Sequence, residues 1–211
     1  MDKKKLLVMS VSFGLAVALT AAAAGVYAEG AESDIARGVI RFHVLANSDA
    51  GYDQALKLKV RDAVLAEMSP LLSGAGNPDQ SAAVIADNIP AIERTAEDAV
   101  KANGYAYPVR AALADDMFPT KSYGDVTFPA GVYKALRVEI GAAKGHNWWC
   151  VMFPPLCFAE SGDAALSPSS KAELQSAMPD DAYALVTSQS RDIKVKFKLV
   201  EIFDSIINGN P

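Results

Sequence analysis

A long apolar run near the N-terminus is the first pattern along the chain. Three lysines precede it, and Leu6–Ala28 contains no charged residue. A basic start, an uncharged stretch and small side chains at Val26 and Ala28 are typical of an export signal. We therefore expect residues 1–28 to be a signal peptide that is cleaved after Ala28.

Retention of this segment as an uncleaved membrane anchor is the alternative, because a helix of about 20 apolar residues spans a bilayer. In both cases the lysines stay on the cytoplasmic side, so the remainder of the chain crosses the membrane.

Beyond the apolar run, the hydrophobic period switches between that of strands and that of helices. In Val39–Asp49, apolar residues alternate with Arg41 and His43, which predicts a strand with one apolar face. Residues 47–49 suit a helix N-cap, and the following pattern predicts a helix that ends at Pro70. The apolar face of this helix comprises Leu56, Val60, Ala63, Val64 and Met68.

The middle of the chain predicts a second helix followed by strands. Apolar residues recur at helical spacing from about Gln80 to Asn103, and Pro90 either kinks this helix or starts a new one. Alternating patterns in residues 105–118 and 132–141 predict two strands, which we expect to pair antiparallel. Residues 147–153 add a short strand.

The C-terminal third is more polar. A short helix starting at Ser167-Pro168 is expected within residues 161–181, which we otherwise expect to be mobile. Residues 190–207 fit both a strand and a helix, and a helix is favoured because the apolar period continues past Leu199.

These elements predict an α+β fold in which a small, mostly antiparallel sheet packs against two to four helices, preceded by the signal or anchor helix. We expect residues 29–211 to form a single exported domain, with 38–160 as its best-defined part.

The charge balance excludes one class of partner. The formal net charge is −5, and removal of three lysines and one aspartate with residues 1–28 takes it to −7. An acidic domain without a basic stripe is not expected to bind nucleic acid or to hold anionic lipid by charge.

The chain's two cysteines, Cys150 and Cys157, lie close together in an exported sequence. An even count in an oxidising compartment favours a disulfide, with two buried free thiols as the alternative. Zinc would need four ligands, for which the cysteines, His146 and His43 are available, but their spacing matches no known zinc pattern. We expect no metal and no cofactor.

A catalytic role for one of the cysteines, as a nucleophile, is a more specific alternative. It would need a base such as His146 or His43 and an orienting partner such as Asn147, and it would make the protein an exported cysteine-dependent hydrolase acting on cell wall or peptide. No serine motif is present, and Gly141–Gly145 is too short for a phosphate loop and is typical of a flexible turn. We therefore expect no catalytic residues and no enzymatic activity.

Aromatic residues gather around the cysteines. Trp148 and Trp149 are adjacent, so in an alternating segment both cannot face inward. Tryptophan is a residue type that anchors protein interfaces, and this segment is therefore a candidate contact surface.

Three long stretches carry a family resemblance. They are IRFHVLANSDAGYDQALKLKVRDAVL (Ile40–Leu65), FPTKSYGDVTFPAGVYKALRVEIG (Phe118–Gly141) and AKGHNWWCVMFPPLCF (Ala143–Phe158). Together they resemble the stage II sporulation protein R family. The resemblance implies a signalling protein made in the forespore and secreted into the space between the forespore and mother-cell membranes. There it would trigger a membrane-embedded aspartic protease, which cleaves the precursor of sigma-E.

On this reading the protein acts by binding rather than by catalysis. The expected receptor-contact residues flank the cysteine ring and include a nearby loop. They are His146, Asn147, Trp148, Trp149, Lys121, Ser122 and Tyr123.

Overall fold

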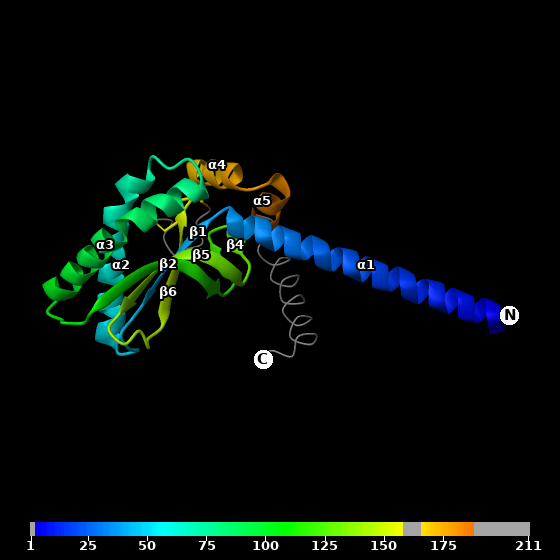
Figure 1. Cartoon of the computed structure of the whole chain (residues 1–211), viewed down its shortest axis with the longest axis horizontal. Helices are drawn as coiled ribbons and strands as arrows, with labels where there is room; N and C mark the ends of the chain where they lie inside the picture. Colours follow the sequence, from blue (N-terminus) through cyan, green and yellow to red (C-terminus); the bar gives the residue numbers. More distant parts are fainter. Residues whose placement is uncertain (1–2, 158–165, 188–211) are drawn as a thin grey trace.

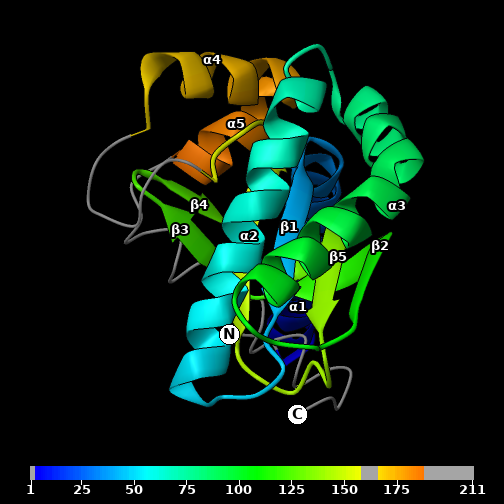
Figure 2. The same cartoon turned by 90° about the vertical axis from the view of Figure 1, so that its left-hand side faces the viewer.

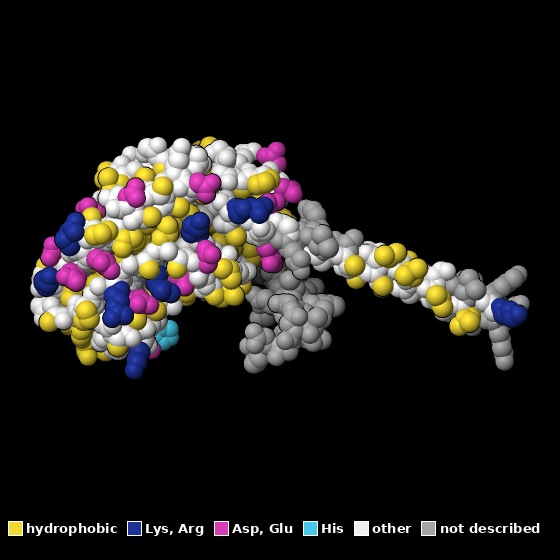
Figure 3. Space-filling view, in the orientation of Figure 1, with side chains coloured by type: hydrophobic (Ala, Val, Ile, Leu, Met, Phe, Trp, Pro, Cys, Tyr) yellow, Lys and Arg dark blue, Asp and Glu magenta, His cyan; other side chains and the backbone are white. Residues whose placement is uncertain are grey.

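The N-terminal apolar run forms one continuous helix, α1 (Lys3–Arg37), that projects from the body of the molecule (Figure 1). The computed structural model describes residues 3–157 and 166–187. Apolar side chains along the projecting part, such as Phe13 and Leu19, are exposed (Figure 3), whereas Ala31 and Ile35 are buried in the body. The helix therefore runs through Ala28 without a break and belongs to the folded domain only in its last turns. Within the described residues, no helix meets the length and apolarity needed to cross a membrane.

A mixed four-stranded sheet forms the centre of the body. Its order is β2 (Val109–Phe118), β5 (Gly131–Ile140), β1 (Ile40–Leu45) and β6 (Asn147–Phe153). β1 runs parallel to β5, while β1–β6 and β2–β5 are antiparallel. The predicted antiparallel pairing of residues 105–118 with 132–141 is confirmed, as is the mostly antiparallel α+β fold.

Two long helices, α2 (Gly51–Leu72) and α3 (Pro78–Ala102), cover one face of the sheet (Figure 2). Asn77 caps α3 by accepting a hydrogen bond from the backbone N–H of Gln80 at 2.9 Å. Between sheet and helices lies the larger of two apolar clusters. Its fully buried members include Phe42, Val44, Val60, Val64, Met68, Ile85, Ile92, Ala96, Val100, Leu136 and Val138.

Two expectations for α2 are wrong. The helix continues through Pro70 to Leu72, because buried Met68 and Leu72 pack its last turn onto the core. Its N-cap is Ala50, which forms no side-chain cap, since Asn47 and Ser48 instead donate to the carboxylate of Asp53 at 2.8 and 2.6 Å. Pro90, for which two readings were open, lies inside the single helix α3.

The second face of the sheet is covered at one end by smaller elements. These are the β3–β4 hairpin (Lys121–Tyr123 and Val126–Phe128), the helices α4 (Pro168–Ala177) and α5 (Asp180–Thr187), and the last turns of α1. The strands of the hairpin are too short to give an alternating signal, and the sequence did not predict them. The predicted helix start is confirmed, because Ser167 accepts a hydrogen bond from Ser170 N–H at 3.1 Å.

This covering layer corrects the prediction for β1. The strand was expected to have one apolar face, yet Arg41 is 0% and His43 4% exposed. Both faces of β1 are buried, because rings of the hairpin cover Arg41 and the rings of Phe118 and Trp149 cover His43. The predicted helix at residues 190–207 lies outside the described residues.

Candidate functional site

A disulfide joins Cys150, in the middle of β6, to Cys157 beyond the end of that strand, with their Cα atoms 5.4 Å apart. Cys150 is fully buried opposite Phe42 on the helix-covered face, whereas Cys157 is partly exposed. Inside the ring, the Leu156 N–H donates to the Val151 carbonyl at 3.1 Å. The predicted disulfide is thus present, and it is anchored in the core at one end.

An apolar cavity of about 360 Å³ lies beside this ring. Side chains of the ring form one wall, the C-terminal half of α2 forms another, and α4 contributes Glu173 and Ser176. The apolar lining comprises Leu65, Met68, Leu72, Met152, Phe153 and Pro155.

Trp148 and Trp149 lie on opposite faces of the sheet. Trp148 packs edge-on against Phe42 at 5.7 Å between ring centroids, and the guanidinium of Arg61 lies 4.8 Å from the Trp148 ring. Trp149 stacks on His43 at 4.9 Å with the ring planes within 6°, and contacts Phe118. Both indoles are partly exposed. Because they lie on opposite faces of the sheet, they contribute to two separate surfaces along β6 and not to a single one.

Residues 121–123 also differ from one another in what their side chains contact. Lys121 and Ser122 are partly or fully exposed on the hairpin, while Tyr123 points into the second apolar cluster that Trp149 also borders. The Tyr123 hydroxyl accepts a hydrogen bond from Arg41 Nη2 at 3.1 Å. Of this predicted trio, Tyr123 is therefore chiefly a partner of a buried cation.

That cation, Arg41, is fully buried, and the sequence pattern gave no sign of this. Its guanidinium lies among four aromatic rings, with centroid distances from 4.5 to 5.7 Å. Among the described residues, Nη1 has no hydrogen-bond partner and Arg41 forms no ion pair with a carboxylate. Burial lowers the pKa of the Arg41 guanidinium below its ordinary value. The rings are those of Phe118, Tyr123, Phe128 and Tyr133.

His43 belongs to a polar network on the same face. Its Nε2 lies 3.2 Å from Asp116 Oδ2, and Arg137 Nη1 donates to the other oxygen of Asp116 at 2.9 Å. Burial lowers the pKa of His43, while the contact with Asp116 acts in the opposite direction. Cys150 faces the other side of the sheet and is bonded to Cys157, so the described residues contain no cysteine–histidine pair of the kind a nucleophile needs.

His146 and Asn147 lie where the β5–β6 loop meets β6. The His146 side chain is 81% exposed and contacts Asp49, whose Oδ1 also accepts the His146 N–H at 2.6 Å. Lys57, which is nearly buried, donates from Nζ to the His146 carbonyl at 2.9 Å. Burial lowers the pKa of Lys57. The β5–β6 loop, whose composition suggested a flexible turn, is thus fixed through both its backbone and its side chains.

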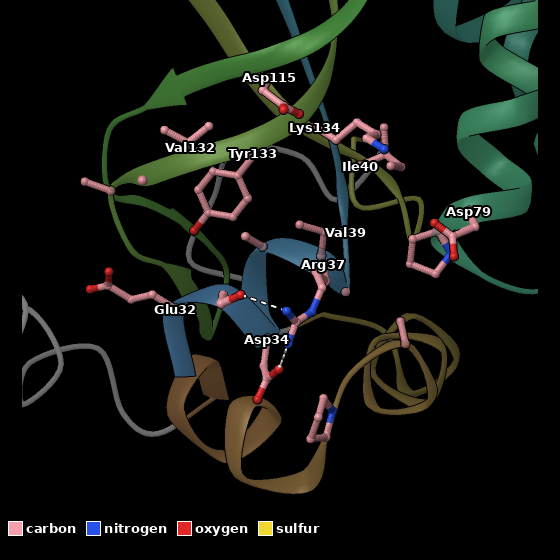
Figure 4. Close-up of a pocket in the computed structure, with 18 residues that line it drawn as sticks. Glu32, Asp34, Arg37, Val39, Ile40, Asp79, Asp115, Val132, Tyr133 and Lys134 are labelled. Atoms are coloured by element: carbon pink, nitrogen blue, oxygen red, sulfur yellow. Dashed lines mark hydrogen bonds and ion pairs between the residues drawn. The ribbon is translucent and has the colours of Figure 1, made fainter. Parts of the chain in front are cut away.

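A groove of about 670 Å³ occupies the opposite end of the sheet, where α1 joins the body (Figure 4). Asp115 and Lys134 project from neighbouring strands at one side, and Asp79 projects from the first turn of α3. Arg37 is bound to Ser33 and Asp34 within α1. The groove is therefore polar at its rim, and the sequence gave no sign of it.

No three histidine, cysteine, aspartate or glutamate side chains converge as metal ligands within the described ranges. The four residues considered for zinc do not meet there, since the cysteines are bonded and His43 and His146 lie in different environments. Ala28, the predicted cleavage point, lies within α1.

Comparison with known proteins gives two matches. The model of the family described as stage II sporulation protein R matches residues 36–163. The stage II sporulation protein R of Bacillus subtilis (strain 168) is 33% identical over 175 residues, which cover 77% of this chain and 78% of that protein. No solved structure matches the chain.

Proposed function

Because the chain belongs to the stage II sporulation protein R family, we propose that it is an exported signal of endospore formation. In this proposal it triggers a membrane-embedded aspartic protease of the mother cell, which then processes the precursor of sigma-E. The observation that carries the proposal is the family match, which spans β1 to the disulfide ring and therefore most of the described body.

Export across the forespore membrane into the intermembrane space is supported by α1. Its projecting part exposes a row of large apolar side chains, with Leu7 66% and Phe13 74% exposed. Soluble domains rarely keep such surface in water, which favours a segment that acts as an export signal. A disulfide agrees with this location, because disulfides persist in oxidising compartments.

Activation by binding fits the geometry better than catalysis. A signal of this kind must bind the active state of its receptor more tightly than the inactive state. The contact residues we propose lie along β6 and the β3–β4 hairpin, next to a ring whose shape is fixed before contact. They are His146, Asn147, Trp148, Trp149, Lys121, Ser122 and Tyr123.

The test is a deletion and complementation experiment in the spore-forming host. Deletion of the chain should abolish cleavage of the sigma-E precursor, and the full-length chain expressed in the forespore should restore it. A chain without residues 1–28 should remain in the forespore and fail to restore cleavage. Normal cleavage in the deletion strain would contradict the proposed function.

A further inference from the structure

We propose that the protein forms a symmetric dimer in which the free edge of β2 pairs antiparallel with the same edge of a second copy. β2 is an outer strand of the sheet, whose order is β2, β5, β1, β6. Within the part of the chain that the structure describes, β2 has a strand neighbour on one side alone, β5 (Figure 2). An unpaired edge of this kind presents backbone N–H and C=O groups to which another strand can add.

This edge is longer and less protected than most. β2 has ten residues, whereas edge strands are usually kept short or are interrupted by proline, lysine or a bulge. Its sequence, VRAALADDMF, contains no proline and no lysine, and its pairing with β5 keeps one register from Val109 to Phe118. The edge is therefore continuous over the whole strand.

Alternation along β2 decides which backbone groups face outward. The Ala111 N–H points away from β5, because it donates to Glu93 Oε1 of α3 at 2.9 Å. The Pro108 carbonyl points toward β5, because it accepts the Gly141 N–H at 2.8 Å. Since the direction alternates from residue to residue, the odd-numbered residues from 109 to 117 offer their N–H and C=O groups to a new neighbour. A second strand would replace the Glu93 contact with a backbone hydrogen bond.

Space for a second strand is present along this edge. A hollow of about 420 Å³ lies beside residues 110–112. Farther along the strand, Asp115 is exposed and the Met117 side chain is 66% exposed. The hollow is lined by charged side chains of both signs, namely Glu93, Arg110, Arg137 and Glu139.

A second copy of the chain complements the edge in one central register. When Leu113 lies opposite Leu113 of the second copy across a two-fold axis, Arg110 of each copy lies opposite Asp116 of the other. These two pairs form at positions whose own backbone groups point toward β5, where facing side chains lie closest and opposite charges stabilise the pairing. In the same register Val109 lies opposite Met117, which gives this exposed side chain an apolar neighbour.

Shifted registers are less complementary. With the axis at Ala112, Val109 lies opposite Asp115, and with the axis at Ala114, Leu113 lies opposite Asp115. With the axis at Asp115, the two Asp115 carboxylates face each other, and like charges directly opposite destabilise a strand pair. None of these registers places Arg110 opposite an aspartate. The charge pattern of β2 thus favours its own copy, centred on Leu113, as the strand that adds to it.

Pairing through β2 leaves the proposed receptor contacts on β6 uncovered. β6, along which Trp148 and Trp149 lie, is the other outer strand of the sheet. In the continuous sheet of the dimer, the two copies of β6 lie at opposite ends. Each dimer would then present two copies of this contact surface, so that a receptor array could be bound at two points.

Engineered cysteines test both the dimer and its register. In the central register Ala112 lies opposite Ala114 of the second copy, at a spacing that a disulfide bridges. A host expresses two full-length chains, one with Ala112→Cys and one with Ala114→Cys, and the exported protein is separated on a non-reducing gel. We expect a disulfide-linked dimer when both chains are present and none from either chain alone. A dimer from either chain alone, or none from the mixture, would overturn this pairing.

Sedimentation equilibrium of the exported protein measures the dimer without an engineered bond. Arg110→Glu places like charges at both ion pairs, so we expect the dissociation constant of the dimer to rise by about tenfold or more. Lys59→Glu is the matched control, since Lys59 is exposed on α2, which packs against β1 and β6. Its dissociation constant should stay within about twofold of the native value.

Equal effects of the two charge reversals, or a native protein that is monomeric, would exclude a second copy as the partner of this edge. Neither measurement involves signalling, so a negative result here leaves the proposed function untouched. Failure of the proposed function would look different, because cleavage of the sigma-E precursor would persist when the whole chain is deleted.

Discussion

Arg41 Nε donates a hydrogen bond of 3.1 Å to the carbonyl of Cys150, so the buried cation is tied to the disulfide through the β1–β6 pair. Arg41 therefore connects the aromatic cluster to the backbone of the cysteine ring. The charge is stabilised by ring faces and two hydrogen bonds and not by an ion pair with a described carboxylate.

Replacement of Arg41 should separate the effect of its volume from that of its charge. Arg41→Ala should lower the free energy of unfolding by about 3 kcal/mol or more, because it leaves a cavity among four rings. Arg41→Met should cost less, since it fills similar volume and no longer buries a charge. Urea denaturation of both variants measures the difference. Equal losses for Ala and Met would show that the cation itself, not packing, stabilises the cluster.

The disulfide should contribute to stability through its short ring. For a sequence separation of 7, the chain-entropy model gives about 2.5 kcal/mol. Cys150→Ser with Cys157→Ser should lose about that amount, weaken sigma-E precursor cleavage and leave secretion intact. Adding a reductant to the native protein should reproduce the loss in denaturation, whereas the double variant should not respond. Unchanged cleavage by an exported double variant would exclude the ring from signalling.

His43 should make the domain less stable in mild acid. Burial lowers the pKa of His43 in the folded state, so the unfolded chain takes up the proton first as the pH falls below about 6.5. The stability that the neutral His43 side chain contributes is therefore complete above about pH 6.5 and declines as the pH falls below that value. His43→Gln should give a shallower dependence of unfolding free energy on pH between 5 and 7. Parallel profiles for the two proteins would mean that His43 titrates normally.

Gly145 offers a test of how tightly the β5–β6 loop packs on the β1–α2 loop. Gly145→Ala should lower the unfolding free energy by about 1–3 kcal/mol, because its Cβ would collide with the Ser48 carbonyl oxygen. Gly74→Ala is the matched control, since nothing lies within 4 Å of a Cβ there. Thermal denaturation compares the two. Similar small effects at both positions would indicate that the loops yield easily.

Ile35 marks where the N-terminal helix becomes part of the domain. Ile35→Ala should cost about 2–5 kcal/mol, because this side chain is fully buried against the second cluster. Leu19→Ala, on the exposed part of the same helix, should change the unfolding free energy by less than about 0.5 kcal/mol. N-terminal sequencing of the exported protein should begin at Glu29, two residues before the first buried position. A start beyond Ile35 would contradict this boundary.

The strands and helices with strong periodicity were predictable from the sequence. Residues 40–45, 109–118 and 131–140 form strands, and α2 and α3 lie where helical spacing placed them, because apolar residues recur in these segments with the period of the element. The second layer was not predictable. β3 and β4 are three residues long, and rings from these strands, Tyr123 and Phe128, help to bury Arg41.

The candidate site was predicted in part for the same reason. The disulfide followed from two cysteines in a chain expected to be exported, and adjacent tryptophans had to separate. The contact between the β1–α2 and β5–β6 loops was missed, because Asn47 and Ser48 were interpreted as a helix cap and residues 141–145 as a flexible turn. Only the fold reveals that these two segments, almost a hundred residues apart in sequence, bind each other.

The central position of β1 has a consequence for how the protein reaches its destination. Its neighbours in the sheet are β5 and β6, and Phe42 pairs with Cys150, roughly a hundred residues later in the chain. A polypeptide threaded through a translocation channel from its N-terminus cannot complete this sheet until β6 has emerged. In the proposed export, β1 would therefore leave the channel first and wait for β6, which would keep the chain unfolded and competent for translocation for most of the passage of residues 40–153.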